Sequence, residues 1–245
     1  MQKIVLSNYE ELSVETAKRI AGIIKQKPDA LLCFPAGETA LGTFAVLVNL
    51  QKKGKINFSH CKIVGLDEWV HLAEMKKENC YSFLKKHFFD YLDIKPGNLC
   101  FFNGEANDLV NECQVTDRFI KSNGGIDLML LGLGMNGHLG LNEPGSGFET
   151  DSHLVFLDEV TQKVGQKYFS SVTILSQGIT LGLKQVMESG CVILQASGSK
   201  KLPIVKKLIE SSISNKFPAS ILHRHQNAFL LLDQEANPEK EVKYG

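Results

Sequence analysis

Two residues that can transfer protons stand in a glycine-rich segment between Gly132 and Pro144. His138 and Glu143 are separated there by four residues, and the segment follows the apolar run 126–131, a predicted strand. An imidazole titrates near neutral pH, and a neighbouring carboxylate can fix which ring nitrogen carries the proton. A lone loop histidine more often only satisfies a backbone carbonyl. The glycines and the terminal proline favour an acid–base pair here.

A further carboxylate comes directly after another predicted strand. Asp67 follows the apolar run 61–66. In open parallel sheets, ligands bind outside the carboxyl ends of the strands, so this side chain is expected in the same crevice as His138. Asp67 is therefore a candidate general base. A helix cap or a surface turn is the alternative of equal weight.

Two strand-to-helix turns have features of an anion site. Gly37 and Thr39 lie where strand 30–34 passes into a predicted helix, whose first N–H groups and dipole attract phosphate. Taken alone, an ordinary turn capped by Thr39 is the commoner explanation. Lys201 opens a helix after strand 192–196 and can reach a phosphate as a point charge, although adjacent lysines are usually solvated.

The same glycine-rich segment also matches a dinucleotide-binding pattern. Gly132, Gly134 and Gly137 spell G-x-G-x-x-G after a strand. That site needs a long helix after the glycines to hold the pyrophosphate. Gly140 and Pro144 oppose such a helix, so the sequence argues against a nicotinamide site.

Short apolar runs alternate with amphipathic stretches along the whole chain. Nearly continuous apolar strands are typical of a largely parallel sheet covered by helices on both faces. We therefore expect one α/β domain over residues 1–245. Its predicted strands are 30–34, 61–66, 99–102, 126–131, 154–157, 192–196 and 228–232, and its predicted helices are about 9–26, 39–53, 78–92, 106–122 and 200–212.

The composition excludes several classes of protein. The 245 residues are 43% hydrophobic and 22% charged, as in ordinary globular proteins. The 27 Lys and Arg residues balance 27 Asp and Glu residues, so no overall field attracts nucleic acid or anionic lipid. Six cysteines without a C-x-x-C spacing are expected as buried free thiols. With neither a signal peptide nor an apolar run of about 20 residues, the expected location is cytoplasmic.

These motifs resemble the hexosamine-6-phosphate isomerase/deaminase family, and most of all its galactosamine-6-phosphate type. The resemblance rests on the segments 131–144, 66–69 and 178–183 and extends from about residue 27 to residue 232. The related 6-phosphogluconolactonases share the glycine–histidine portion but lack the Asn-Glu-Pro that follows it. The resemblance implies a Rossmann-like, doubly wound α/β fold and an enzyme without a metal or redox cofactor. Such an enzyme opens the ring of a 2-amino-2-deoxyhexose 6-phosphate, isomerises the aldose to a ketose and releases ammonia.

The resemblance also implies a role for each motif residue. Asp67 corresponds to the general base that moves a proton between C2 and C1. His138 corresponds to the acid/base that opens the ring, and Glu143 to the carboxylate that supports it. The positions corresponding to the family's phosphate pocket are Gly37, Thr39 and Lys201.

Three positions depart from the family pattern. Asn136 replaces an aspartate and is neutral, so we expect His138 to hold its proton less firmly unless Glu143 compensates. Glu38 replaces a small residue in the phosphate turn, and we expect its side chain to point outward along the first helical turn. Lys167 stands in place of an arginine of the glucosamine-type members and loses the bidentate contact with phosphate.

The sequence thus predicts conversion of galactosamine 6-phosphate, by preference, to tagatose 6-phosphate and ammonia, with glucosamine 6-phosphate as the other candidate substrate. Two alternatives stay open: a 6-phosphogluconolactonase-type hydrolase, and a non-catalytic sugar-phosphate-binding regulator suggested by Asn136 and Glu38. The expected partner is a small sugar phosphate, not nucleic acid or membrane, and a homo-oligomer is compatible with the sequence. The span 145–175 is a candidate closing lid.

Overall fold

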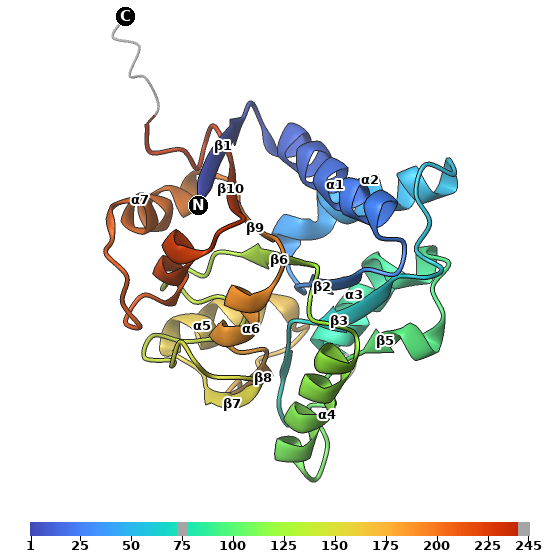
Figure 1. The fold of residues 1–245 in the computed structure, drawn as a ribbon. Coiled ribbons are helices and arrows are strands. Elements are labelled where there is room, and N and C mark those ends of the chain that lie inside the picture. Colours follow the sequence, from blue (N-terminus) through green and yellow to red (C-terminus); the bar gives the residue numbers. More distant parts are fainter. Residues whose placement is uncertain (73–77, 240–245) are drawn as a thin grey trace, which may run out of the picture.

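A seven-stranded sheet in which every pairing is parallel forms the centre of the molecule (Figure 1). The structure, a computed structural model, describes residues 1–72 and 78–239. The predicted, largely parallel α/β sheet is confirmed. In sheet order the strands are β1 (Gln2–Leu6), β10 (Ala228–Asp233), β9 (Val192–Ala196), β6 (Leu128–Gly132), β2 (Leu31–Phe34), β3 (Lys62–Gly65) and β5 (Leu99–Cys100).

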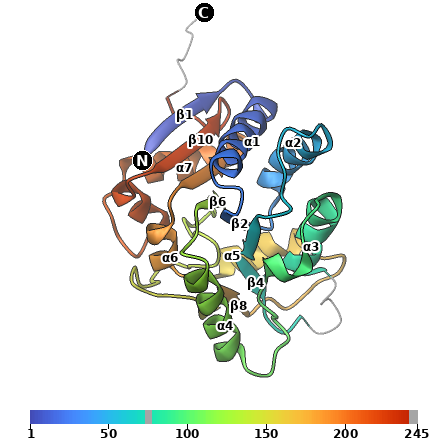
Figure 2. The same cartoon turned by 45° about the vertical axis from the view of Figure 1, so that its right-hand side comes forward.

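Helices cover both faces of this sheet, because successive strand residues point to opposite sides. In β2, Leu31 and Cys33 belong to one apolar core, whereas Leu32 and Phe34 belong to the other. The views in Figures 1 and 2 place the helices accordingly. One face packs against α1 (Tyr9–Gln26), α2 (Leu41–Lys52) and α3 (Cys80–His87), and the other against α4 (Leu109–Ser122), α6 (Leu183–Glu188) and α7 (Leu202–Glu210).

The first helix begins as its sequence predicts. The side chain of Asn8 accepts a hydrogen bond from the backbone N–H of Glu11 at 2.9 Å, which satisfies one of the free donors of the first turn. The Glu11 carboxylate accepts in return from the N–H of Ser7, at 3.2 Å. The capping residues therefore fix the start of α1 over the sheet.

A smaller antiparallel sheet, which the sequence analysis did not predict, flanks the site. It is formed by β4 (Asp67–Trp69), β8 (Gln177–Thr180) and β7 (His153–Phe156), and α5 (Glu159–Gly165) follows it. The predicted strand 154–157 is β7, but it belongs to this second sheet. Because β4 has only three residues and two of them are acidic, it lacks the apolar pattern by which a strand is predicted from sequence.

Several predicted boundaries shift, and some elements were missed. The helix predicted over 78–92 is α3 followed by a 3-10 turn at Phe89–Tyr91, and shorter 3-10 turns precede α2 and α7. The strands predicted at 99–102 and 126–131 are 99–100 and 128–132. Elements absent from the prediction are β1, β4, β8, α5, α6 and the 3-10 helix Pro218–Arg224.

The order of the strands creates a crevice beside β2 and β6. From β2 the chain proceeds to β3 and β5 on one side, whereas from β6 it proceeds to β9 and β10 on the other. The loops after β2 and β6 therefore diverge at the carboxyl end of the sheet, and such a switch point is where α/β folds bind ligands.

The six cysteines are free, as predicted. Five of them are buried, as predicted, and Cys100 is half-buried. Among the described residues, no helix has the length and apolar character needed to cross a membrane.

A cluster of phenylalanines under α2 and α3 provides a test of the core. The Phe88 ring is fully buried, stacks on Phe44 at 4.5 Å and meets Phe34 at 5.1 Å. We expect Phe88→Ala to lower the free energy of unfolding in urea by about 3–5 kcal/mol through lost burial and a residual cavity. Phe156→Ala is the matched control, because that ring is 79% exposed and its loss is expected to cost within about 0.5 kcal/mol. Equal losses in the two variants would contradict this description of the core.

Candidate active site

A pocket opens at the carboxyl ends of the parallel strands, where the loops after β2 and β6 diverge. Six of the eight residues predicted to form the site line this pocket. Five of them follow the carboxyl ends of four parallel strands, and the sixth lies in the segment after α5. The other two, Asn136 and Glu143, lie behind His138 and do not line it. The six lining residues are Gly37, Thr39, Asp67, His138, Lys167 and Lys201.

Asp67 reaches the pocket from the first position of β4. Leu66 lies between β3 and β4 and is bonded to both sheets: its N–H donates to the carbonyl of Phe34, and its carbonyl accepts from Leu181. Asp67 is therefore a strand residue, and the helix-cap and surface-turn alternatives are wrong.

The surroundings of Asp67 favour its protonated form. Burial raises the pKa of its carboxyl to about 7, and the charge of Glu68 adds to this rise, whereas a hydrogen bond with the Cys80 thiol opposes it. A carboxyl with a pKa near neutrality can both accept and return a proton under physiological conditions. Asp67 thus has the position and the acidity of a general acid–base group.

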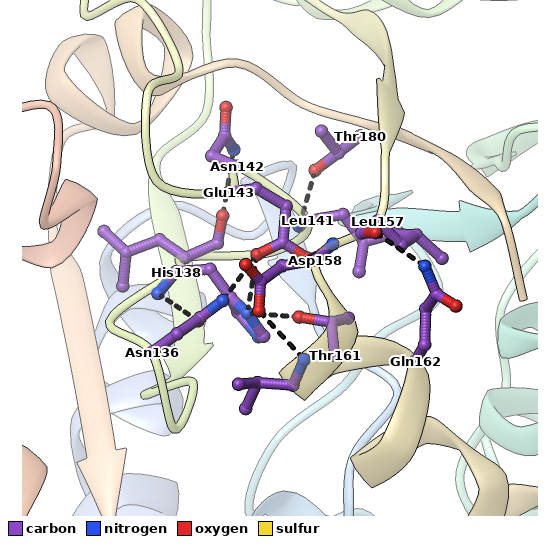
Figure 3. A network of polar contacts seen from close by, with 12 residues as sticks. Asn136, His138, Leu141, Asn142, Glu143, Leu157, Asp158, Thr161, Gln162 and Thr180 are labelled. Carbon is purple, nitrogen blue, oxygen red and sulfur yellow. Dashed lines mark hydrogen bonds and ion pairs between the residues drawn. The ribbon is translucent and has the colours of Figure 1, made fainter.

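His138 is held from behind by a network of polar side chains (Figure 3). Its Nδ1 lies 3.1 Å from the hydroxyl of Thr161 and 3.5 Å from Oε2 of Glu143. The Asn136 amide donates to the same Glu143 oxygen at 2.8 Å, and the N–H of Asp158 donates to the other oxygen at 3.3 Å. Since Nδ1 is engaged, Nε2 is the nitrogen through which His138 would act on a ligand.

Glu143 supplies the negative charge in this network. Its burial alone would raise the pKa of the carboxyl, but its contacts with His138, Thr161 and Asn136 outweigh burial and hold the pKa below its ordinary value. Asn136 contacts this carboxylate and the backbone N–H of His138, at 3.2 Å. The neutral residue at position 136 therefore stabilises the charged partner of the imidazole and leaves that partner ionised.

Glycines give the loop after β6 its close turns. A Cβ on Gly134 would lie 2.4 Å from the His138 ring, so only glycine lets the ring lie against this backbone. Gly137 has a φ of +90°, where other residues are strained, and a Cβ there would strike the Phe217 ring. The next helix, α5, begins only at residue 159. The predicted lack of a long helix directly after these glycines is confirmed.

The turn after β2 has a different geometry from the predicted capped helix start. Gly37 is extended, Glu38–Ala40 form a 3-10 turn, and neither that turn nor α2 has a side-chain cap, so capping by Thr39 is wrong. The hydroxyl of Tyr9 fixes this turn: it lies 3.1 Å from the carbonyl of Thr39 and accepts from the N–H of Gly42 at 2.8 Å.

Two lysines bring positive charge to this end of the pocket. Lys201 Nζ donates to the Leu133 carbonyl at 2.5 Å, and burial, with a contribution from the charge of Lys167, lowers its pKa to about 8. Lys167 Nζ pairs with Glu38 at 2.5 Å. The expectation that Glu38 points away along the helix is therefore wrong, because its carboxylate meets Lys167 beside the pocket.

The sequence analysis missed several supporting residues. Glu68, Cys80, Thr161, Tyr168 and Gln195 line the pocket or contact the residues that do. Gln195 could have been found from the sequence, because it is a polar residue inside the apolar strand β9. Thr161 and Tyr168 could not, since their positions depend on how the second sheet packs against the first.

Within residues 1–72 and 78–239, no group of three or more His, Cys, Asp or Glu side chains is arranged to hold a metal ion.

The raised pKa of Asp67 predicts a pH-dependent gain of stability in Asp67→Asn. An aspartate that titrates near 3.8 when unfolded and near 7 when folded costs stability as pH rises between these values, and the full cost is present above pH 7. We expect the variant to be about 2–4 kcal/mol more stable than the wild type at pH 8 and nearly equal to it at pH 3.5. Denaturant unfolding at the two pH values measures this, and equal stabilities at pH 8 would contradict the assignment.

Known proteins resemble this chain over most of its length. A family model described as glucosamine-6-phosphate isomerases/6-phosphogluconolactonase matches residues 7–231. Glucosamine-6-phosphate deaminase of Clostridium botulinum (strain Langeland) is 37% identical over 99% of this chain and 100% of its own, and glucosamine-6-phosphate deaminase 1 of Bacillus subtilis (strain 168) is 37% identical over 96% and 98%.

A solved monomeric glucosamine-6-phosphate deaminase superposes with a TM-score of 0.92 at 37% identity, covering 96% of this chain and 98% of that one. The Trypanosoma brucei 6-phosphogluconolactonase shares the fold, with a TM-score of 0.73 at 20% identity over 96% and 97% of the two chains. The chain belongs to the glucosamine-6-phosphate isomerase/6-phosphogluconolactonase family.

Proposed function

We propose that this protein opens the ring of a 2-amino-2-deoxyhexose 6-phosphate, isomerises it and releases ammonia. The observation that carries the proposal is the meeting, in one pocket, of a carboxyl with a pKa near 7, a carboxylate-backed histidine and a lysine-flanked turn. The names of the relatives at 37% identity support the same chemistry.

The phosphate would bind at the turn after β2. Residues 37–39, whose backbone N–H groups can act as donors, line the pocket together with the ammonium-bearing Lys201. Lys167 can join them only by leaving Glu38, since the two form an ion pair in this structure. The sugar carbons would then extend from this turn toward Asp67 and His138.

His138 would open the ring. Its Nε2 takes the proton of the C1 hydroxyl and returns a proton to the ring oxygen, so that the C1–O5 bond breaks and an aldehyde forms. The imidazolium formed in between is stabilised by Glu143, which its contacts keep ionised. A positioned acid–base group of this kind contributes about 10²–10⁴ in rate.

Asp67 would then carry out the isomerisation. It removes the proton at C2, which is acidified by the neighbouring aldehyde, while the C2 ammonium gives one proton to the aldehyde oxygen, so that an enolamine forms. Asp67 then delivers the proton it has taken up to C1. The product is an imine at C2, to which water adds before ammonia leaves, and the second product is a ketohexose 6-phosphate. The same carboxyl serves both proton transfers because its pKa lies close to neutrality.

The identity of the sugar at C4 remains a prediction. The motifs predict a preference for galactosamine 6-phosphate, with tagatose 6-phosphate as product. The curated relatives compared above are named glucosamine-6-phosphate deaminases, which supports glucosamine 6-phosphate as the substrate to be assayed first.

Ammonia release from the two amino-sugar phosphates tests the proposal. We expect turnover of at least one epimer and a loss of about 10²–10⁴ in rate for Asp67→Asn, because the variant cannot take up the C2 proton. Asp151→Asn, which removes a carboxylate from an exposed ion pair with Lys184, is the control and is expected to keep wild-type activity. Acid production from 6-phosphogluconolactone with no ammonia from either amino sugar would overturn the proposal in favour of a lactonase. Calorimetric binding of the sugar phosphates without turnover would overturn it in favour of a regulator.

A further inference from the structure

A second acidic side chain, outside the pocket lining, lies next to Asp67. Glu68 is only 2% exposed, and its carboxylate accepts three backbone hydrogen bonds. Oε1 accepts from the N–H of Trp69 at 2.8 Å and from that of Cys80 at 2.9 Å, while Oε2 accepts from that of Tyr81 at 3.0 Å. Burying a charge is costly unless it is hydrogen-bonded. Burial raises the pKa of the Glu68 carboxyl to about 6, and these three donors oppose that rise, so the side chain is charged at neutral pH.

Two of these donors belong to the first turn of α3. Cys80 and Tyr81 are its first two residues, and Asn79 caps it through a 2.8 Å bond from the N–H of Ser82. The positive end of a helix dipole stabilises an anion at this place. Glu68 therefore joins β4, which carries Asp67, to the N-terminus of α3 in a fixed geometry.

The Cys80 side chain interacts with both acidic groups. Its thiol is in hydrogen-bonding reach of the carboxyl groups of both Asp67 and Glu68, and it lines the pocket. Position 80 is fixed by the Glu68 carboxylate through its own N–H. Glu68 consequently holds the backbone of the residue whose thiol interacts with Asp67.

We propose that Glu68 is a positioning residue for the reaction: it anchors the strand and the thiol that orient Asp67, and its buried charge acts on Asp67 from the adjacent position. This inference rests on the proposed role of Asp67 as the base. A neutral residue at position 68 would leave Asp67 a weaker base near neutral pH, because a neighbouring negative charge strengthens proton uptake.

Other titratable groups also face Asp67. Cys33 on β2 and Cys80 on α3 are both buried thiols that remain protonated, because burial, with the nearby carboxylates adding to it, raises their pKa values. Glu68 is therefore the acidic neighbour whose charge acts on Asp67 from its own strand. The remaining titratable groups of the pocket are Glu38, His138, Lys167, Tyr168 and Lys201.

Glu68→Gln separates the charge of residue 68 from its packing. The amide oxygen can still accept from the first turn of α3, but the negative charge is gone. We expect the acidic limb of the kcat/KM profile to move to lower pH by about one pH unit, because Asp67 then loses its proton more easily. Glu105→Gln is the matched control: that exposed carboxylate also accepts a backbone bond, from Leu72 at 2.7 Å, and its loss is expected to leave the profile unchanged.

Titration of the Asp67 carboxyl by carbon NMR, assigned by its absence in Asp67→Asn, gives a readout that needs no turnover. The inference predicts a lower midpoint in Glu68→Gln than in the wild type. If Glu68→Gln does not fold, Glu68→Asp keeps the charge, and it should retain the wild-type midpoint while its kcat falls. An unchanged Asp67 midpoint in Glu68→Gln, or a lowered one in Glu68→Asp, would overturn the inference. Absence of ammonia release by the wild-type protein would instead refute the proposed function and leave the NMR result interpretable.

Discussion

The proposed chemistry depends on the partial burial of one carboxyl group, that of Asp67, at the junction of two sheets. The chain leaves the parallel sheet at Gly65 and enters the antiparallel sheet at Asp67, so a single residue separates them. Both sheets hold Leu66 by backbone bonds, which leaves the Asp67 backbone little freedom. Burial at this place raises the pKa of the carboxyl to about 7. Packing in the surrounding cores offsets the free-energy cost of burying this carboxyl. The raised pKa is what would allow the aspartate to exchange protons near neutral pH.

Two carboxyl groups of the site are driven in opposite directions by their surroundings. Burial and the charge of Glu68 raise the pKa of the Asp67 carboxyl, so its proton is held more tightly. Glu143 is buried as well, but it contacts His138, Thr161 and Asn136, which lower its pKa. The proposed mechanism uses this separation: Asp67 would transfer protons, and Glu143 would stabilise the charged imidazole. Lys167 and Lys201 also line the pocket, and Lys167 pairs with Glu38 in the turn after β2, where the phosphate of a sugar would bind under the proposal.

Much of the architecture and of the pocket could be predicted from the sequence, because both follow from local patterns. Apolar runs marked most strands of the parallel sheet, and the residues just after those strands necessarily meet at one edge of it. The antiparallel sheet could not be predicted, since β4 is a three-residue strand that begins with two acids and β8 contains Gly178. The Glu38–Lys167 pair joins residues 129 positions apart. Such a contact depends on how α5 and the turn after it dock against the phosphate turn, which neither composition nor spacing encodes. The hydrogen bond from Asn136 to Glu143 could not be predicted for a related reason. The sequence does not show that the side chain of Asn136 contacts the carboxylate of Glu143 and not the ring of His138.

The most direct test of the account is a crystal structure of the protein with a 2-amino-2-deoxyhexitol 6-phosphate, an open-chain amine that cannot isomerise. The account predicts that the phosphate lies against the N–H groups of residues 37–39 and Lys201, with C1 and C2 beside the carboxyl of Asp67 and the nearby oxygens beside Nε2 of His138. A ligand bound with its phosphate away from this turn, or with C2 beyond the reach of Asp67, would contradict it.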